Sequence, residues 1–176
     1  FGGMHRTISG TAANGTPLIG LNGADNVTID GIRSGGDSLT ISNLSTSISA
    51  GTSTIRFSNG ASGNSILRCR VLGSSLVPIG SGGGVVFFNH TTTGNSNNLI
   101  EDCDLGPAGA NLPNVMIYSF NSTAHTNNII TGNRLYDFFS PTKSSAGIYL
   151  ETGTGWSILN NKLYQTATRT FANNSF

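Results

Sequence analysis

Four short apolar runs recur at a constant interval in this chain of 176 residues. Their middle residues are Arg56, Phe87, Tyr118 and Tyr149, and each lies 31 residues after the one before it. A fixed period of about 20 to 50 residues, with one supersecondary unit per period, is typical of solenoids and propellers. The interval therefore predicts that these four residues occupy equivalent positions in stacked repeats.

A second motif follows these runs. It consists of Asn or a substitute, an aliphatic residue two places later, a small or polar residue at the fifth place and an aliphatic residue at the seventh. The five copies are Asp25, Val27, Asp30 and Ile32; Asn64, Ile66, Cys69 and Val71; Asn98, Ile100, Cys103 and Leu105; Asn128, Ile130, Asn133 and Leu135; and Trp156, Ile158, Asn161 and Leu163. Stacking of the copies would place all fifth positions, from Asp30 to Asn161, in one column.

The residue types within the repeats indicate strands. Short β-branched runs are broken by Gly, Asn and Ser, and no segment has the periodicity of a helix. A propeller blade needs four strands in about 40 to 45 residues, whereas each repeat here has two clear strands and room for a third. We therefore expect an all-β fold, a parallel β-helix of about five coils, with clear coils over residues 17–165 and a single domain over residues 1–176.

A column of aliphatic and aromatic residues is expected to fill the centre of the coils. Equivalent residues of neighbouring coils would lie about 4.8 Å apart, the spacing of paired strands. The expected inward residues are Ile55, Val86, Ile117 and Ile148, then Phe57, Phe88 and Leu150, and, from the second strand, Ile66, Ile100, Ile130 and Ile158. Ser119 interrupts this pattern once.

The coil pattern resembles the right-handed parallel β-helix superfamily, which includes pectate lyases, polygalacturonases and many bacterial surface proteins. The resemblance covers about residues 17–165. The stretches "NVTIDGIRSGGDSLTISN" and "GNSNNLIEDCDLGPAGAN" are also similar in style to repeat regions of very large secreted surface proteins of gliding bacteria. The resemblance implies a right-handed solenoid in a secreted or cell-surface protein, but no catalytic motif of the family can be placed on this chain.

The composition agrees with an extracellular repeat and excludes other classes. Charged residues make up 10% of the chain, the formal net charge is +1 and hydrophobic residues make up 36%. This hydrophobic fraction is enough for a thin continuous core, but the apolar residues are spread too evenly along the chain for a membrane span. The sequence has no Lys/Arg cluster, so a nucleic-acid partner is not expected. Because neither terminal segment resembles a cap, we expect a fragment of a longer solenoid, with neighbouring coils of the same chain as partners.

The stretch "NNLIEDCDL" looks at first like a metal or catalytic site, but the repeat explains its cysteine. Cys69 and Cys103 share one coil position and would be inward neighbours in adjacent coils. We expect buried free thiols. A disulfide stays open as an alternative, because a Cα separation of about 4.8 Å lies within the disulfide range, although parallel side chains would have to turn toward each other.

Charged residues of the same stretch also fit a stack. Asp104 would lie between Arg70 and Arg134, and Arg68 would lie beside Asp102. Cross-strand pairs of opposite charge contribute roughly 0.2 to 1 kcal/mol each, so these residues are expected to fix the register. Glu101 and Asp102 could ligate calcium, but such a site needs about six or more oxygens. No metal and no cofactor are expected.

Polar residues of the turns are given structural roles. His90 and His125 lie between the two strands of their coils at unlike distances from the Asn positions, so solvated turn histidines are expected. Asn64, Asn98 and Asn128 are expected to form a ladder whose side-chain amides hydrogen-bond along the stack.

The four middle residues of the apolar runs are the candidate ligand site. If Ile55 and Phe57 point inward, then Arg56 points outward, and three aromatic rings follow it at about 4.8 Å steps. Such a strip could bind the apolar faces of sugar rings or a protein partner, or a loop could cover it.

The expected function is a rigid structural or adhesive segment of a secreted or cell-surface protein, with a polysaccharide or cell-surface glycan as possible ligand. The alternative is a carbohydrate-active enzyme, either a polysaccharide lyase or a glycoside hydrolase. That chemistry needs paired carboxylates, or a basic group near an acid whose charge a cation neutralises. In the later coils Asp137 and Glu151, with Lys143 in the loop between them, are the acids left without a structural role, and no catalytic residue is assigned.

Overall fold

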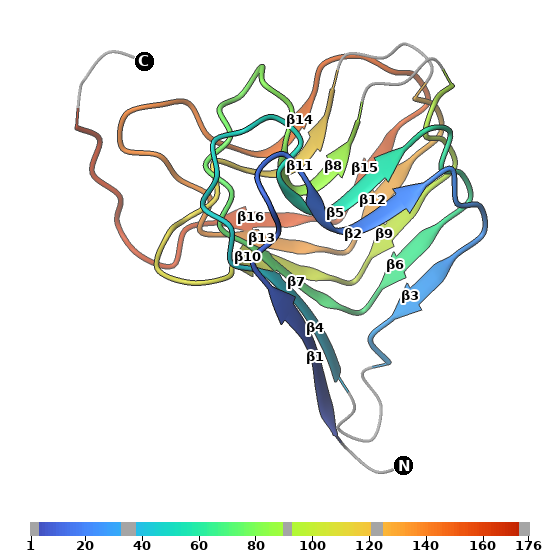
Figure 1. The fold of residues 1–176 in the computed structure, drawn as a ribbon, viewed down its shortest axis with the longest axis horizontal. Coiled ribbons are helices and arrows are strands. Elements are labelled where there is room, and N and C mark those ends of the chain that lie inside the picture. The colour runs from blue at the N-terminus through green and yellow to red at the C-terminus, as the bar shows by residue number, and fades with distance from the viewer. Residues whose placement is uncertain (1–3, 33–37, 90–92, 121–124, 173–176) are drawn as a thin grey trace.

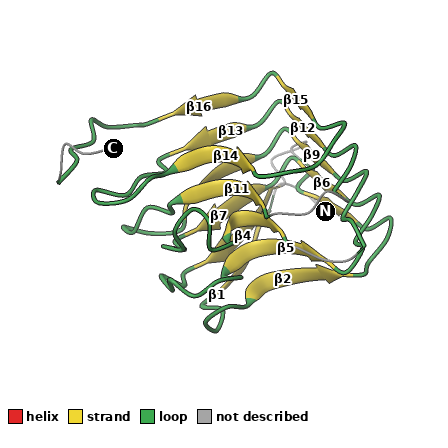
Figure 2. Ribbon diagram, turned by 90° about the horizontal axis from the view of Figure 1, so that it is seen from above, coloured by secondary structure: helices red, strands yellow, loops and turns green. Residues whose placement is uncertain are grey.

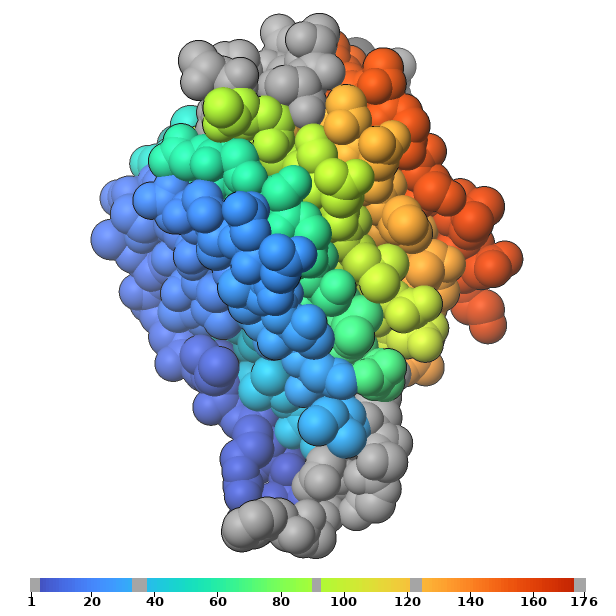
Figure 3. Space-filling view, turned by 90° about the vertical axis from the view of Figure 1, so that its right-hand side faces the viewer, coloured from blue at the N-terminus to red at the C-terminus, as the bar shows by residue number. Residues whose placement is uncertain are grey.

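The computed structural model describes residues 4–32, 38–89, 93–120 and 125–172. In these ranges the chain forms β-strands and no helix, and the strands build a parallel β-solenoid of about five coils (Figures 1 and 2). Successive coils lie side by side in chain order, which the space-filling view shows as oblique bands running from blue to red (Figure 3). The predicted fold class is confirmed. The right-handed sense stays a prediction, which the strong preference of parallel crossovers for that hand supports.

Each complete coil contributes one strand to each of three parallel sheets. Sheet I contains β2 (Pro17–Asn22), β5 (Ser53–Ser58), β8 (Gly84–Phe88), β11 (Val115–Ser119) and β14 (Ala146–Leu150). Sheet II contains β3 (Thr28–Asp30), β6 (Ser65–Leu67), β9 (Leu99–Glu101), β12 (Ile129–Thr131) and β15 (Ser157–Leu159). Sheet III contains β1 (His5–Gly10), β4 (Ser38–Asn43), β7 (Arg70–Gly73), β10 (Asp104–Pro107), β13 (Arg134–Tyr136) and β16 (Lys162–Tyr164).

The first copy of the second motif was placed in the wrong register. Thr28 pairs with Ser65 and Asp30 pairs with Leu67, so Asp30 does not belong to the column of Cys69. Both Val27 and Ile29 could supply the inward aliphatic residue of this short strand. Ile29 packs against the core whereas Val27 is exposed, and burial of Ile29 therefore decides the register. The other four copies pair as predicted.

The sharp corner between sheets II and III depends on left-handed residues. Arg68, Asp102, Gly132 and Asn160 occupy this corner in successive coils with φ between 51° and 68°. Glycine and asparagine adopt this conformation most readily. At Gly132 a side chain would also clash, because a Cβ there would lie 2.4 Å from Oδ1 of Asp102. Glycine at this corner therefore leaves room for the Asp102 side chain of the preceding coil.

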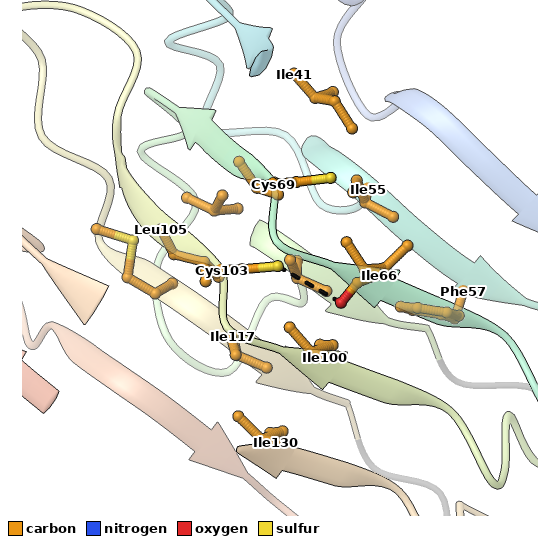
Figure 4. Close-up of a cluster of buried hydrophobic side chains, with 14 of the residues drawn as sticks. Ile41, Ile55, Phe57, Ile66, Cys69, Ile100, Cys103, Leu105, Ile117 and Ile130 are labelled. Atoms are coloured by element: carbon orange, nitrogen blue, oxygen red, sulfur yellow. Dashed lines mark hydrogen bonds between the residues drawn. The ribbon is translucent and has the colours of Figure 1, made fainter. Parts of the chain in front are cut away.

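The core lies inside the coils and is made of stacked aliphatic columns (Figure 4). Ile66, Ile100 and Ile130 are fully buried on sheet II, and they face fully buried residues of the other two sheets, such as Ile117 on sheet I and Leu105 on sheet III. Burial of a side chain of this size stabilises a fold by about 1.5 to 3 kcal/mol. The columns are therefore the main source of stability.

The interruption at Ser119 is compensated by a residue of the following coil. Phe57 and Phe88 stack with their ring centroids 4.5 Å apart, and Ser119 takes the next place in that column. The indole of Trp156 then packs edge-on against Phe88, with ring centroids 5.1 Å apart. Trp156 stands at the ladder position that asparagine occupies in the preceding coils. Its large ring therefore fills space that the small Ser119 side chain leaves in the core.

The end coils leave their core columns open. Ile158 and Leu163, which continue the columns of sheets II and III, are 44% and 47% exposed, and Ile8 in β1 at the other end is 46% exposed. Their equivalents in the inner coils are fully buried. Both ends of the stack therefore present apolar surface beside strand edges.

Candidate functional site

The four candidate ligand-binding residues lie in one row of sheet I, as the 31-residue interval predicts. Arg56 in β5 pairs with Phe87 in β8, Phe87 with Tyr118 in β11, and Tyr118 with Tyr149 in β14. The rings of Phe87 and Tyr118 stack with centroids 5.8 Å apart, and those of Tyr118 and Tyr149 lie 5.3 Å apart. The row is therefore confirmed as a continuous column.

Of the two alternatives for this column, an exposed strip or a strip covered by a loop, the structure shows cover for the two middle residues. Phe87 and Tyr118 are 1% and 0% exposed. Ile79 and Phe120 pack against them from outside the coil. The covering segment fits closely, because a Cβ on Gly82 would lie 3.0 Å from the Phe87 ring. The column is thus a second, smaller hydrophobic core outside sheet I.

The polar atoms of this column are also engaged. The Tyr118 hydroxyl donates a hydrogen bond to Glu151 and accepts one of 3.2 Å from the backbone N–H of Gly80. Burial, followed by the bond to Glu151, raises the pKa of Tyr118 well above its ordinary value. The hydroxyl therefore stays protonated and joins the covering segment to Glu151, the residue directly after β14.

Arg56 is held by the backbone of neighbouring turns. Its Nη1 donates to the carbonyl oxygens of Gly15 and Gly51, at 3.2 and 3.4 Å. Burial lowers the pKa of Arg56 below its ordinary value. Ligand binding by the four residues stays a prediction, but only Arg56 and Tyr149 are partly accessible.

The buried turn ladder is present as predicted. Oδ1 of Asn98 accepts hydrogen bonds of 3.0 Å from both the backbone N–H and the side-chain amide of Asn64. Oδ1 of Asn128 does the same for Asn98, at 2.9 and 3.1 Å. All three side chains are at most 1% exposed. Each amide therefore satisfies backbone groups that the tight turn would leave unpaired.

The two cysteines belong to a second ladder at the corner between sheets II and III. Oδ1 of Asn133 accepts from the Cys103 N–H at 2.9 Å, and the Asn133 amide donates to Ile100 O. The Cys103 thiol occupies the place of that amide and donates to Ile66 O at 3.5 Å (Figure 4). Both thiols are free and buried, as expected. Their role here is that of a small hydrogen-bonding core residue.

The charged residues of "NNLIEDCDL" take part in pairs between coils. Asp104 pairs in register with Arg70 and Arg134, as predicted, and Nε and Nη2 of Arg134 donate to its two oxygens at 2.5 and 2.7 Å. That bond raises the pKa of Arg134. Arg68 and Asp102 occupy equivalent corner positions in adjacent coils, as predicted, and the Arg68 guanidinium also donates to both carboxylate oxygens of Asp30. The hydrogen bond to Asp30 is the largest cause that raises the pKa of Arg68, and the charge of Asp102 adds to it.

The predicted solvated histidine is wrong at position 125. His125 is fully buried, and its Nδ1 accepts a 3.0 Å hydrogen bond from the backbone N–H of Asn95. Its ring also lies edge-on to Phe88. The imidazole therefore belongs to the packed interior and is not solvated. His90 lies outside the described residues.

The two acids that had no assigned role each have a structural partner. Glu151 accepts from Tyr118. Asp137 accepts from the backbone N–H of Thr166 at 2.8 Å and from its hydroxyl at 2.5 Å, and it forms an ion pair with Arg169. Partial burial would raise the pKa of Asp137, but these hydrogen bonds and the Arg169 charge lower it below its ordinary value. Both acids thus fasten chain segments to the stack.

A second aromatic column, on the outer face of sheet III, was missed in the sequence. Tyr136 in β13 and Tyr164 in β16 pair in register, and their rings stack with centroids 5.8 Å apart. Tyr164 is 42% exposed. The repeated triplets "RLY" and "KLY" carry the signal, because the residue after an inward leucine must face outward.

A shallow groove of about 440 Å³ follows the corner beside this column. It is lined by residues that include Arg68, Asp102, Arg134, Asn160 and Lys162. Within the described ranges, no group of three or more His, Cys, Asp and Glu side chains is placed to hold a metal ion. The groove therefore offers charged and amide groups for a polar ligand.

The chain matches no family model, and no curated protein or solved structure is significantly similar to it. The parallel β-solenoid is shown by the structure, and membership of the pectate-lyase-like superfamily stays a prediction. None of the described residues forms a helix with the length and apolar character needed to cross a membrane.

Proposed function

We propose that this chain is a structural and adhesive segment of a secreted or cell-surface β-solenoid. The observation that carries the proposal is the use of its polar residues. The Asn64–Asn98–Asn128 ladder, the thiol of Cys103 and the acids Asp137 and Glu151 all bond to neighbouring segments of the chain. Side chains that could perform chemistry are thus engaged in holding coils together.

The ladders support a rigid body. An unpaired buried polar group costs about 1 to 3 kcal/mol, so sliding one coil against the next would leave several amides unsatisfied at once. Because the bonds run along the stack, each coil fixes the register of its neighbour. Such a body suits a spacer that keeps a fixed length.

The open end faces support a role within a longer stack. The inward leucine and isoleucine columns reach both ends without a polar cap among the described residues, and the strand edges of β14, β15 and β16 are unpaired on one side. A further coil of the same kind would bury these columns and pair these edges. Neighbouring coils are therefore the partners that the two ends fit.

The amino-acid composition supports an extracellular location. The chain is rich in Gly, Ser, Thr and Asn and has few charges, as in the secreted repeat proteins that it resembles. An antibody raised against the purified chain should label intact cells or the culture fluid of the source organism. Label found only after the cells are broken would contradict the proposal.

The adhesive part of the proposal needs its own test, because a carbohydrate-active enzyme is the alternative. The chain should be retained on one or more members of a polysaccharide panel and release neither reducing ends nor unsaturated products. Catalytic turnover would overturn the proposal in favour of the enzyme. Retention without turnover supports it.

A further inference from the structure

The outer face of sheet III carries two parallel columns of outward residues. One column runs through Arg70, Asp104, Arg134 and Lys162, and the other, two residues further along each strand, ends in Tyr136 and Tyr164. Residues two apart on a strand point to the same face and lie about 6.8 Å from each other. Each tyrosine of β13 and β16 therefore has a basic residue beside it.

The Tyr136 ring lies over a glycine that leaves room for it. A Cβ on Gly106 in β10 would lie 2.3 Å from Cζ and 2.6 Å from the hydroxyl oxygen of Tyr136, so a larger residue there would displace the ring. Tyr136 thus leans across β10, and Tyr164 stacks on Tyr136 with an angle of 23° between the ring planes. The rings form a tilted aromatic surface on the outside of the sheet.

This surface differs from the column on sheet I in its exposure. Tyr164 is 42% exposed, Tyr136 is half-buried, and the Arg134 side chain is 51% exposed. By contrast Tyr118 is fully buried. Aromatic rings that stay accessible beside polar groups are typical of surfaces that bind ligands with one apolar and one polar face.

The charge of this face is positive. The charged column has three basic residues and one acid, and Asp104 is engaged in its two hydrogen bonds with Arg134. Arg70 and Lys162 are exposed and pair with no carboxylate in the part of the chain that the structure describes. A ligand that meets both columns must therefore combine a flat apolar ring face with an anionic group.

We propose that the outer face of sheet III binds a glycan whose sugar rings carry anionic groups, with Tyr136 and Tyr164 against ring faces and Lys162 and Arg70 on the anionic groups. The site rests on the adhesive function proposed above and assigns that function to a surface other than the buried column of sheet I. Single contacts of this kind are weak. Repetition of the site along a polymer would raise the avidity by about 10² to 10⁴.

Affinity electrophoresis of the whole chain in gels that contain dextran, carboxymethyl dextran or dextran sulfate tests the proposal. The three polymers share one backbone and differ in charge. We expect retardation by a charged polymer and none by dextran, and the two charged arms tell a carboxylate from a sulfate. Tyr164→Ala should weaken the retardation about 3- to 10-fold, because loss of a ring contact removes about 0.5 to 1.5 kcal/mol.

Matched variants separate this site from general attraction of a basic protein to a polyanion. Lys162→Gln should weaken retardation about 2- to 5-fold, whereas Lys143→Gln, which removes the same charge from an exposed loop, should leave it unchanged. Equal retardation of wild type and Tyr164→Ala would overturn the site but keep the adhesive function. Absence of retardation by all three polymers would overturn the site as well, and retention on the wider polysaccharide panel then decides the adhesive function.

Discussion

Two aromatic columns run along the outside of this solenoid, and they differ in what lies over them. The column of sheet I contains Phe87 and Tyr118, which are buried beneath Ile79 and Phe120. The column of sheet III contains Tyr136 and Tyr164, and Tyr164 is 42% exposed. The same residue type at the same strand spacing thus serves as core on one face and as accessible surface on the other.

The length of the segment between sheets III and I explains the difference. Residues 74–83, between β7 and β8, form a segment long enough to return over sheet I, where Gly80 donates to the Tyr118 hydroxyl. From the second coil onward, however, sheets II and III are joined by a corner of only two residues, such as Arg68 and Cys69. A corner this short cannot reach across the outer face of sheet III. An outward position is therefore accessible only where no long connection crosses it.

The largest effect is expected from removing a ring of the buried column. Tyr118→Ala should lower the free energy of unfolding by about 3 to 5 kcal/mol, because it leaves a cavity between Phe87 and Phe120. Urea denaturation followed by circular dichroism measures the change. A loss below about 1 kcal/mol would mean that the covering segment does not pack on sheet I in solution.

A smaller loss is expected where the chain after sheet III is fastened. Asp137→Ala removes the acceptor of Thr166 and Arg169 and should cost about 2 kcal/mol, since hydrogen bonds to charged groups contribute about 1.5 to 3 kcal/mol each. The pKa of Asp137 is lower in the folded chain than the ordinary 3.8, so its contribution is complete above about pH 4 and is lost as the pH falls through the lowered value.

Acid titration of wild type and Asp137→Ala measures this contribution directly. The difference in stability between the two should be constant near neutral pH and should shrink below pH 4. A difference that grows toward acid would contradict the depressed pKa.

The charged column beside the exposed tyrosines should be moderately sensitive. Asp104→Lys places four basic residues in one row and should lower the stability by about 1 kcal/mol, whereas Asp104→Asn should cost less because the pair is partly exposed. Thermal denaturation at low and high salt checks this, since screening should reduce the difference between the two variants. If Asp104→Asn is the more damaging variant, hydrogen bonding rather than charge governs this row.

The smallest effect is expected at the exposed ring itself. Tyr164→Ala should change the free energy of unfolding by less than about 0.5 kcal/mol, as is usual for surface substitutions. Its measurement beside Tyr118→Ala compares the two columns directly. A loss similar to that of Tyr118→Ala would show that the sheet III column is also covered.

The stacking pattern could be predicted from the sequence because it depends on equivalent residues. The interval of 31 residues gave the row from Arg56 to Tyr149, and the recurring asparagines gave the ladder through Asn98. In the ladder asparagine repeats, and in the row aromatic residues follow Arg56, because the next coil needs the same kind of contact. Register was lost only in the first coil, where Val27 and Ile29 were equally suitable inward residues.

Burial on the outside of the coils could not be predicted in the same way. The cover over Phe87 includes Phe120, which has no aromatic equivalent at the 31-residue period, and the burial of His125 has no counterpart in the repeated motifs. The additional hydrogen bonds of Arg68 to Asp30 depend on the side-chain direction at a left-handed corner. Tertiary packing decides the burial and pairing of these side chains, and the 31-residue interval carries no information about that packing.

Trp156 is an intrinsic fluorescence probe for the separation of the coils. It is the single tryptophan of the chain, and its indole lies edge-on to Phe88, so its fluorescence reports whether the last coil is docked. Cys103, buried two coils away, can react with a thiol reagent only when the interior opens. A stack held by contacts between neighbours unravels from its ends. The emission of Trp156 should therefore change before Cys103 becomes reactive, and the delay between the two signals measures how cooperatively the coils separate.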